Sequence, residues 1–252
     1  MPDSPQSPAP LLTIVTVTAN DPEGLSNTLE SLQQLKVEAM SSIEVLVQDG
    51  GSDSIERIAI QYDGLAEFES VKDLGIYDGM NRALARSTGQ YVWFLNGGDT
   101  SIVSEWKLLE RELVKFPSQV LFAGYVLKTG NRVIPRDSRQ SSYIWHGLPT
   151  SHQAIFYPGA VIRREQYDLA YRIVGDYEVT ARILAQGTPS RVIELRVAAF
   201  LTGGTSQTHS DLIAIEAKRV QRSVLKTGRM RQIMSRLLHR VSSYRRQLQT
   251  HP

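Results

Sequence analysis

Cysteine is absent from this 252-residue sequence, so no disulfide can form, and the absence fits a reducing compartment. No uninterrupted apolar run approaches the roughly 20 residues that span a lipid bilayer. The first ten residues are rich in Pro and Ser, and they lack the basic and apolar stretches of a signal peptide. We therefore predict a disordered leader over residues 1–10 and a protein that stays in the cytoplasm.

Acidic side chains are missing from residues 218–252, which contain ten Lys or Arg and no Asp or Glu. Subtracting those ten from the 28 basic residues leaves 18, against 26 acidic residues, so residues 1–217 carry a net charge of −8. The body of the protein is therefore acidic and its C-terminal end is strongly basic.

The C-terminal end, residues 211–252, also carries apolar residues at helical spacing, and we predict a basic amphipathic helical tail there. Two interpretations remain open. The tail packs on its own domain, or residues 218–252 hold the protein peripherally on the anionic inner face of the cytoplasmic membrane. No nucleic acid is expected as a partner, because Tyr244 is the tail's only aromatic residue.

Four short apolar segments in the first hundred residues predict strands, and helical patterns or polar turns separate them. The segments are residues 11–18, 43–48, 68–71 and 91–95. Asp21 followed by Pro22 is typical of a helix start, with a capping side chain and then a proline in the first turn. The alternation predicts a doubly wound α/β half with right-handed crossovers.

The pattern is looser after residue 100. It predicts a hairpin over 120–127 and 132–134, an aperiodic loop over 138–150, and a strand over 154–157. A helix over 175–185 and a late strand over 191–200 follow. We assign residues 11–210 to one domain.

Polar residues follow each of the four early strands. Asn20 follows the first strand, Asp49 the second, Asp73 the third and Asp99 the fourth. Open α/β sheets bind ligands at the carboxyl ends of their strands, so these groups are expected at one edge. Carboxylates there accept hydrogen bonds from ribose hydroxyls and base N–H groups, or hold a cation that neutralises a diphosphate. Each residue alone is explained by capping a turn, but four together favour a site.

Six segments occur in an order that resembles a known family. They are TVTAN, VQDGGSDS, DLGIYDGMNRALARSTGQYVWFLNGGD, SHQAIFY, VGDYEVTARIL and FLTGGTS, and they cover residues 11–206. The set resembles the inverting family 2 glycosyltransferases of the GT-A fold, in particular the colanic-acid type of bacterial exopolysaccharide assembly. The resemblance implies a Rossmann-like, mostly parallel sheet flanked by helices. It also implies a nucleotide-sugar donor, a UDP-sugar, and a lipid-linked glycan acceptor.

The resemblance implies roles for individual residues. The predicted nucleotide-sugar-binding set is Val17, Thr18, Asn20, Asp49, Asp73, Asp78, Asn81, Asn96 and Asp99. In this set Asp78 and Asn81 border the diphosphate or the donor sugar, and Asp99 is the metal ligand. His152, Gln153 and Trp145 are expected to contact the acceptor or the diphosphate.

Asp176 lies at the position of the family's catalytic base. Inversion by direct displacement needs a carboxylate beside the acceptor hydroxyl, because that hydroxyl loses its proton as it attacks the anomeric carbon. The simpler interpretation of Asp176 is a cap on its own helix. Glu178 is the alternative base, and we expect it to be a solvated residue of the first helical turn.

The sequence departs from the family at Asn96-Gly97-Gly98-Asp99, where only one carboxylate is present. A single carboxylate with water and phosphate oxygens still suffices for Mg²⁺, which keeps several waters, so we predict a divalent metal, Mg²⁺ or Mn²⁺. The reduced motif also leaves open a catalytically silent nucleotide-sugar-binding or scaffold subunit of a polysaccharide synthesis complex.

Overall fold

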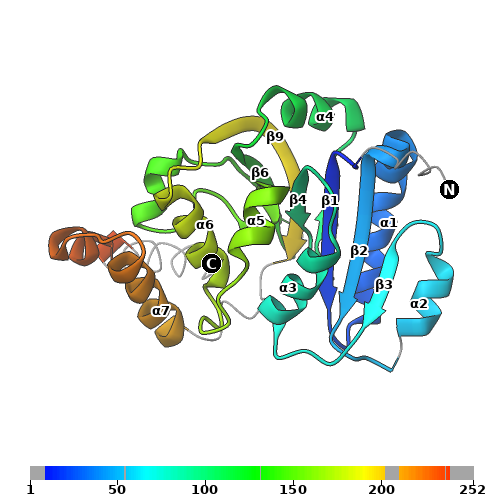
Figure 1. Cartoon of the computed structure of the whole chain (residues 1–252), viewed down its shortest axis with the longest axis horizontal. Coiled ribbons are helices and arrows are strands. Elements are labelled where there is room, and N and C mark those ends of the chain that lie inside the picture. Colours follow the sequence, from blue (N-terminus) through cyan, green and yellow to red (C-terminus); the bar gives the residue numbers. More distant parts are fainter. Residues whose placement is uncertain (1–8, 54, 131, 202–209, 236, 239–252) are drawn as a thin grey trace, which may run out of the picture.

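The computed structural model describes residues 9–53, 55–130, 132–201, 210–235 and 237–238. Most of the predicted leader and the end of the tail lie outside these residues. Within them, nine strands form one sheet in the order β3-β2-β1-β4-β8-β6-β9-β5, with β7 paired to β6. The predicted α/β architecture is confirmed (Figure 1).

The first half of the sheet is parallel. The chain runs β1 (Leu12–Thr18), α1 (Pro22–Ala39), β2 (Ile43–Asp49), α2 (Ile55–Gln61), β3 (Glu67–Ser70), α3 (Ile76–Arg86) and β4 (Tyr91–Phe94). Strand β1 pairs in parallel with β2 and β4, and β2 pairs in parallel with β3. Helix α1 starts as predicted, because Asp21 accepts a hydrogen bond from the Gly24 N–H (2.8 Å) and Pro22 occupies the first turn.

The second half of the sheet is mixed. Its elements are β5 (Thr100–Ser101), α4 (Trp106–Lys115), β6 (Val120–Thr129), β7 (Arg132–Arg136), β8 (Ile155–Pro158), α5 (Gly159–Glu165), α6 (Gly175–Ala185) and β9 (Ser190–Leu201). The predicted hairpin is β6 and β7, and the predicted helix over 175–185 is α6. The segment expected as an aperiodic loop contains a 3₁₀ turn, η2 (Ser141–Trp145), and a second one, η3 (His152–Ala154), precedes β8.

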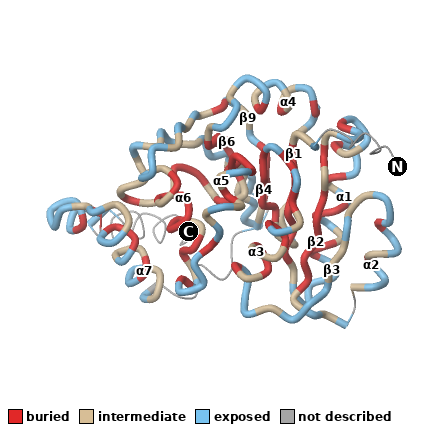
Figure 2. The backbone as a smooth tube through the Cα atoms, viewed as in Figure 1, coloured by how far each residue is buried: buried red, intermediate tan, exposed pale blue. Residues whose placement is uncertain are grey.

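Side chains from successive positions of β1 enter two different cores, as a period of two requires. Ile14 belongs to the layer under α1, α2 and α4, where Leu29 and Leu109 are fully buried. Val15 and Val17 belong to the layer under α3, α5 and α6. Burial is therefore concentrated along the central strands, with helices on both faces (Figure 2).

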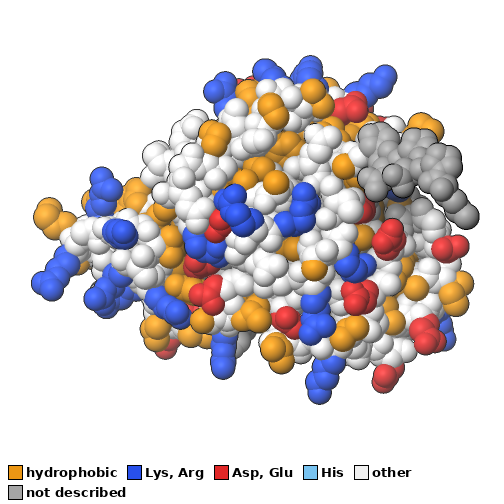
Figure 3. All heavy atoms as spheres, in the orientation of Figure 1, with side chains coloured by type: hydrophobic (Ala, Val, Ile, Leu, Met, Phe, Trp, Pro, Cys, Tyr) orange, Lys and Arg blue, Asp and Glu red, His pale blue; other side chains and the backbone are white. Residues whose placement is uncertain are grey.

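The tail begins with α7 (Ser210–Ser223), which packs on α6. Val220 joins Tyr171, Val174, Tyr177 and Ala181 in a third buried cluster. Of the two interpretations left open, packing on the domain therefore holds for α7. A further helical stretch over residues 229–235 leaves apolar side chains exposed, and Lys and Arg side chains gather on the same lobe (Figure 3).

The described residues contain no helix that is long and apolar enough to cross a membrane.

Candidate functional site

Asp49 closes the carboxyl end of β2 and is fully buried. Its carboxylate accepts hydrogen bonds from the Ser52 N–H (2.6 Å), the Ser52 hydroxyl (2.6 Å), the Gly51 N–H (3.0 Å) and the Ser70 hydroxyl (2.6 Å). Burial by itself opposes ionisation, but these hydrogen bonds outweigh it and lower the pKa of Asp49. Asp49 is therefore a favoured site for a negative charge, and it ties the turn after β2 to the end of β3.

Asp73 lies where β2, β3 and α3 converge, and two glycines make room for it. A Cβ atom at Gly79 would lie 3.0 Å from Asp73 Oδ2, and one at Gly50 would lie 3.1 Å away. The other carboxylate oxygen accepts from the Gly75 N–H at 3.0 Å. These glycines were not among the predicted site residues, although the Asp-Gly pairs Asp49-Gly50 and Asp78-Gly79 are a visible signal in the sequence.

Asp78 and Asn81 make contacts within the protein. Asp78 Oδ2 accepts from the Leu74 N–H and from Arg82 Nε, both at 3.1 Å, and so supports the start of α3. The Asn81 amide donates to the Tyr167 carbonyl (2.9 Å) and accepts from the Tyr167 N–H (2.8 Å). These contacts hold the segment before α6 against α3. The contacts predicted between these two side chains and the donor stay predictions.

Two residues of the predicted set carry buried polar atoms without a hydrogen-bond partner among the described residues, Thr18 Oγ1 and Asn96 Oδ1. Thr18 is the last residue of β1, and Asn96 lies two residues after the end of β4. A Cβ at Gly97 would lie 3.0 Å from Thr18 Oγ1. Thr16 Oγ1, deeper in β1, is a third such atom. Because buried polar groups in native proteins are nearly always bonded, unpaired atoms at a sheet edge point to a ligand.

Val17 and Asn20, the other two predicted site residues in and after β1, make backbone contacts with neighbouring turns. Val17 is buried, and its carbonyl accepts from the Gly97 N–H at 2.9 Å. Asn20 is exposed with a positive φ of 54°, which Asn tolerates better than most residues, and its N–H donates to Ser52 Oγ (2.6 Å). The turn after β1 is thus joined to the turn after β2.

The structure brings Asp99 and Gln153 together. Gln153 Nε2 donates to Asp99 Oδ2 at 2.9 Å. Burial raises the pKa of Asp99 to about 6, although the hydrogen bonds from Gln153 and from the backbone of the Asn96 turn lower it. Thr28 of α1 fixes this turn, because its hydroxyl donates to the Asp99 carbonyl (2.7 Å) and accepts from the Gly98 N–H (3.0 Å). Thr28 lies in an ordinary helical pattern, so no sequence signal marked it.

His152 and Trp145 lie in different surroundings. The His152 ring is buried, stacks on Phe94 with ring centroids 5.1 Å apart, and shares a 2.7 Å hydrogen bond with the Tyr167 hydroxyl. Burial lowers its pKa to about 3, so a neutral ring supplies no positive charge to a diphosphate. Trp145 is half-buried beside His146, whose Nδ1 is 2.8 Å from Ser235 Oγ in the tail.

Asp176 is the second residue of α6 and is half-buried. Burial raises its pKa to about 6, and the charge of Glu216 adds to this. The hydrogen bond from the Tyr177 N–H to Asp176 Oδ1 (2.8 Å) lowers the pKa. The Tyr77 ring of α3 packs directly on Gly175, where a Cβ would lie only 2.7 Å from the ring. Close packing of α3 and α6 therefore brings Asp176 to the donor-side helix.

Glu178 is not the solvated residue that we expected. It is 3% exposed, and both of its oxygens bind Arg182, at 2.9 Å to Nε and 3.0 Å to Nη2. Arg182 also binds Glu165 at 2.7 Å. The expectation is wrong because α5 covers this side of α6, and a buried carboxylate needs a charged partner. A carboxylate fixed in this way is a poor general base.

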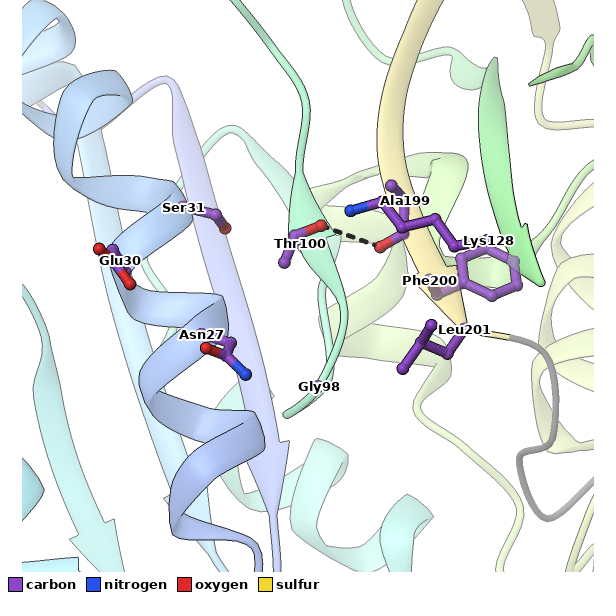
Figure 4. A pocket seen from close by; sticks show the side chains of 9 residues that line it. All are labelled: Asn27, Glu30, Ser31, Gly98, Thr100, Lys128, Ala199, Phe200 and Leu201. Atoms are coloured by element: carbon purple, nitrogen blue, oxygen red, sulfur yellow. Dashed lines mark hydrogen bonds between the residues drawn. The ribbon is translucent and has the colours of Figure 1, made fainter. Parts of the chain in front are cut away.

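A cavity with a volume of about 450 Å³ opens beside the turn after β4. It lies between Asn27 and Glu30 of α1, Gly98 of the turn after β4, Lys128 of β6 and Phe200 of β9 (Figure 4). The volume falls in the range of small-molecule sites. Asp176 does not line the cavity, so a hydroxyl bound there would not lie against that carboxylate.

The described residues contain no group of three or more His, Asp or Glu side chains that could hold a metal ion. Two side chains offer oxygen ligands near the end of β4, the Asp99 carboxylate and the unpaired side-chain amide oxygen of Asn96, Oδ1. Hard cations such as Mg²⁺ and Mn²⁺ take such ligands together with phosphate and water. One carboxylate and one amide oxygen therefore fit a metal ion whose other ligands are phosphate and water oxygens.

Comparison with relatives identifies a protein class. An uncharacterised glycosyltransferase of Mycobacterium tuberculosis is 34% identical over 93 residues, a match that spans 36% of this chain and 35% of the relative. The matched region is thus about a third of that relative's length. A PGL/p-HBAD biosynthesis glycosyltransferase of Mycobacterium bovis is 26% identical over 225 residues, with 81% of this chain and 82% of the relative covered.

Solved structures share the fold at low identity. Residues 1–349 of TarS from Staphylococcus aureus, crystallised with UDP-GlcNAc, superimpose with a TM-score of 0.66 at 16% identity, covering 89% of this chain and 69% of that fragment. A mannosyltransferase of Pyrobaculum calidifontis, in complex with GDP-Man and Mn²⁺, gives 0.63 at 13%, covering 88% and 66%. The fold is the predicted GT-A type. The model of the family described as "Glycosyl transferase family 2" matches residues 13–168, more than half of the chain, and this protein belongs to that family.

Proposed function

We propose that the protein transfers a sugar from a nucleotide-sugar donor, a UDP-sugar, to a hydroxyl of a lipid-linked glycan with inversion, and that Asp176 is the base. The observation that carries this proposal is the half-buried Asp176 carboxylate, with its pKa raised to about 6, packed through Gly175 against α3. A base works best when its pKa lies near the working pH. The proposed role in bacterial exopolysaccharide assembly rests on the sequence resemblance, and the proposed cytoplasmic location rests on the composition of the sequence.

Each residue has one task in this mechanism. Asp176 accepts the proton of the acceptor hydroxyl while that oxygen attacks the anomeric carbon and the bond to the nucleoside diphosphate breaks. Thr18 and Asn96 hold the donor through their unpaired oxygens, and Asp49 keeps the turns of the donor edge in place. When bound, a divalent cation would neutralise charge on the diphosphate, and Asp99 would be its protein ligand.

Asp176→Asn tests the base. The change keeps the volume and removes the proton acceptor, so kcat falls by roughly 10²- to 10⁴-fold while donor affinity stays within about twofold. Donor affinity is measured by calorimetry, and transfer by product formation. Full activity in this variant removes Asp176 from the mechanism.

The donor and the metal are tested together by thermal shift with UDP-sugars and GDP-mannose, with and without Mn²⁺. A ligand that binds the native state raises the melting temperature. The neighbours bound to UDP-GlcNAc and to GDP-Man with Mn²⁺ make these the first compounds to try. In Asp99→Asn the Mn²⁺-dependent part of the shift disappears. An unchanged Mn²⁺ response in that variant excludes Asp99 as a ligand.

We propose an anionic membrane surface as the partner of residues 218–252. In the described part of the tail Met230, Ile233 and Leu237 are 85%, 56% and 55% exposed, next to Arg229 and Arg231. Apolar and basic residues on one helical stretch are the composition of an interfacial helix. Since α7 packs on α6, point substitutions are a better test than removal of the whole tail.

The triple change of Met230, Ile233 and Leu237 to Ser is expected to reduce co-sedimentation with anionic vesicles severalfold, and to leave donor binding unchanged. The matched control replaces Ile60, Val114 and Val133, which are 79%, 62% and 66% exposed on the body. Equal vesicle binding by the two triple variants rejects the membrane partner.

A catalytically silent nucleotide-sugar-binding or scaffold subunit is the second candidate, favoured by the single carboxylate of the Asn96–Asp99 turn. It predicts a thermal shift with a nucleotide sugar but neither transfer nor slow donor hydrolysis. The presence of Asp176 with a raised pKa argues for catalysis.

A further inference from the structure

We propose that Glu216, on the tail helix α7, is a positioning residue that fixes the backbone in front of Asp176. This inference rests on the proposed role of Asp176 as the base. Glu216 lies 40 residues after Asp176 in the sequence, outside the segment matched by the family model, which ends at residue 168.

The contact is a carboxylate held by three consecutive backbone N–H groups. Glu216 Oε1 accepts from the Arg172 N–H at 2.9 Å, and Oε2 accepts from Ile173 at 3.0 Å and Val174 at 3.1 Å. Glu216 is 5% exposed, so removal of this acceptor would leave buried donors unpaired. Hydrogen bonds from backbone N–H groups to a carboxylate are strong, and these three bonds fix the backbone of residues 172–174.

The three N–H groups lead directly into α6. Val174 is the residue before the helix, and no side chain of its own segment caps it. Glu216 binds N–H groups at and before the N-cap position, so it fixes the chain as it enters α6. Its negative charge lies at the N-terminal end of α6, where the helix dipole favours it. Asp176 follows Val174 by two residues, so the position of its Cα is set by the backbone that Glu216 holds.

Tyr77 holds the same segment from the opposite side. Its hydroxyl donates to the Ile173 carbonyl at 2.6 Å, and its ring packs on Gly175. The segment before the base is thus clamped between α3 of the donor side and α7 of the tail. Misplacement of a reacting group by about 1 Å costs up to roughly 10²-fold in rate, so a clamp at this point has a catalytic consequence.

The charge of Glu216 reaches Asp176 as well. The groups that face Asp176 are Tyr77 of α3, Tyr157 of β8, Tyr167 before α6, and Glu216. Burial raises the pKa of each of the three tyrosines, so they stay neutral between pH 4 and pH 9. Of these four groups Glu216 is the one whose charge acts on Asp176, and it helps to raise the pKa of Asp176.

Glu216→Gln tests the proposal, with Asp211→Asn as the matched control. Asp211 is an exposed carboxylate on the same helix. In Glu216→Gln we expect kcat to fall about tenfold, the donor KM to stay within about twofold, and the acid limb of the kcat profile to move to lower pH. Asp211→Asn is expected to match the wild type in all three.

Asp176 is titrated by carboxyl NMR in the wild type and in Glu216→Gln, and its pKa is expected to fall in the variant. An unchanged pKa with wild-type kcat overturns the proposal. Equal relative losses of kcat, donor affinity and folded fraction also overturn it, because they indicate a purely structural residue. Full activity of Asp176→Asn is a different result, since it rejects the proposed base while the NMR titration still reports on Glu216.

Discussion

Two carboxylates in this molecule have opposite environments. Asp49, in the parallel half, is fully buried and receives four hydrogen bonds, so its pKa is lowered. Asp176, in the half built by α6 and α7, is also desolvated, but it faces another negative charge, and its pKa is raised to about 6. Hydrogen-bond donors decide the difference, because burial acts in the same direction on both. A carboxylate whose hydrogen bonds outweigh burial holds structure, and one whose hydrogen bonds are outweighed by burial is suited to exchange a proton.

The pH dependence of sugar transfer is expected to show the largest difference between these two carboxylates. With saturating donor, kcat is expected to fall about tenfold for each pH unit below about 6, because Asp176 must be ionised to accept a proton. Asp49 stays ionised throughout that range and adds nothing to the slope. A kcat that stays constant down to pH 4 would show that the two carboxylates do not differ in this way.

Stability gives the second test, with opposite signs. Because folding lowers the pKa of Asp49, this residue stabilises the fold at a pH above the pKa that it has in the unfolded chain. That stabilisation is lost as the pH falls through the pKa of Asp49 in the folded protein. The raised pKa of Asp176 does the reverse, since its ionisation at neutral pH opposes folding. At pH 7 we expect Asp49→Asn to lose about 1–3 kcal/mol of unfolding free energy. Asp176→Asn should lose none or gain on the order of 1 kcal/mol.

Urea unfolding at pH 7 and at pH 4.5 measures both variants. Comparable losses for the two substitutions at pH 7 would contradict the comparison, because they would mean that Asp176 is as well supported by hydrogen bonds as Asp49.

Gly79→Ala is expected to have the smallest effect. The added Cβ would lie 3.0 Å from Asp73 Oδ2, so the donor edge must shift by a few tenths of an ångström. Alanine otherwise favours a helix by up to about 1 kcal/mol, which offsets the crowding in stability. We expect donor affinity to fall roughly threefold to tenfold, while unfolding free energy changes by less than about 1 kcal/mol. Gly147→Ala, where the nearest atom is 3.9 Å away, is the control.

The parallel half was predictable because its information is local. Strands of β-branched and apolar residues end in Asp or Asn, and helices begin at a capping residue, so β1, β2 and β4 start and stop within one residue of the prediction. The edge position of Asp49, Asp73 and Asp99 followed from one topological rule. Helix α6 was predicted to the residue for the same reason.

The surroundings of Asp176 were not predictable in this way. The Glu216 contacts join residues 42 to 44 apart, and the Tyr77 contact joins residues 96 apart. The sequence of an amphipathic helix does not reveal whether a carboxylate on it is solvated or binds the backbone of another segment. The same ambiguity explains Glu178, which was expected in solvent and is paired with Arg182.

By itself, the sequence determined the α/β class, the order of the strands and helices, and which polar residues stand at the strand ends, because these depend on neighbours in the chain. The tertiary structure decided the direction in which the pKa values of Asp49, Asp99 and Asp176 are shifted, and the partners of His152, Gln153 and Asp176. The physical reason is that a pKa and a hydrogen bond depend on desolvation and on donors brought from distant segments, which no local pattern contains.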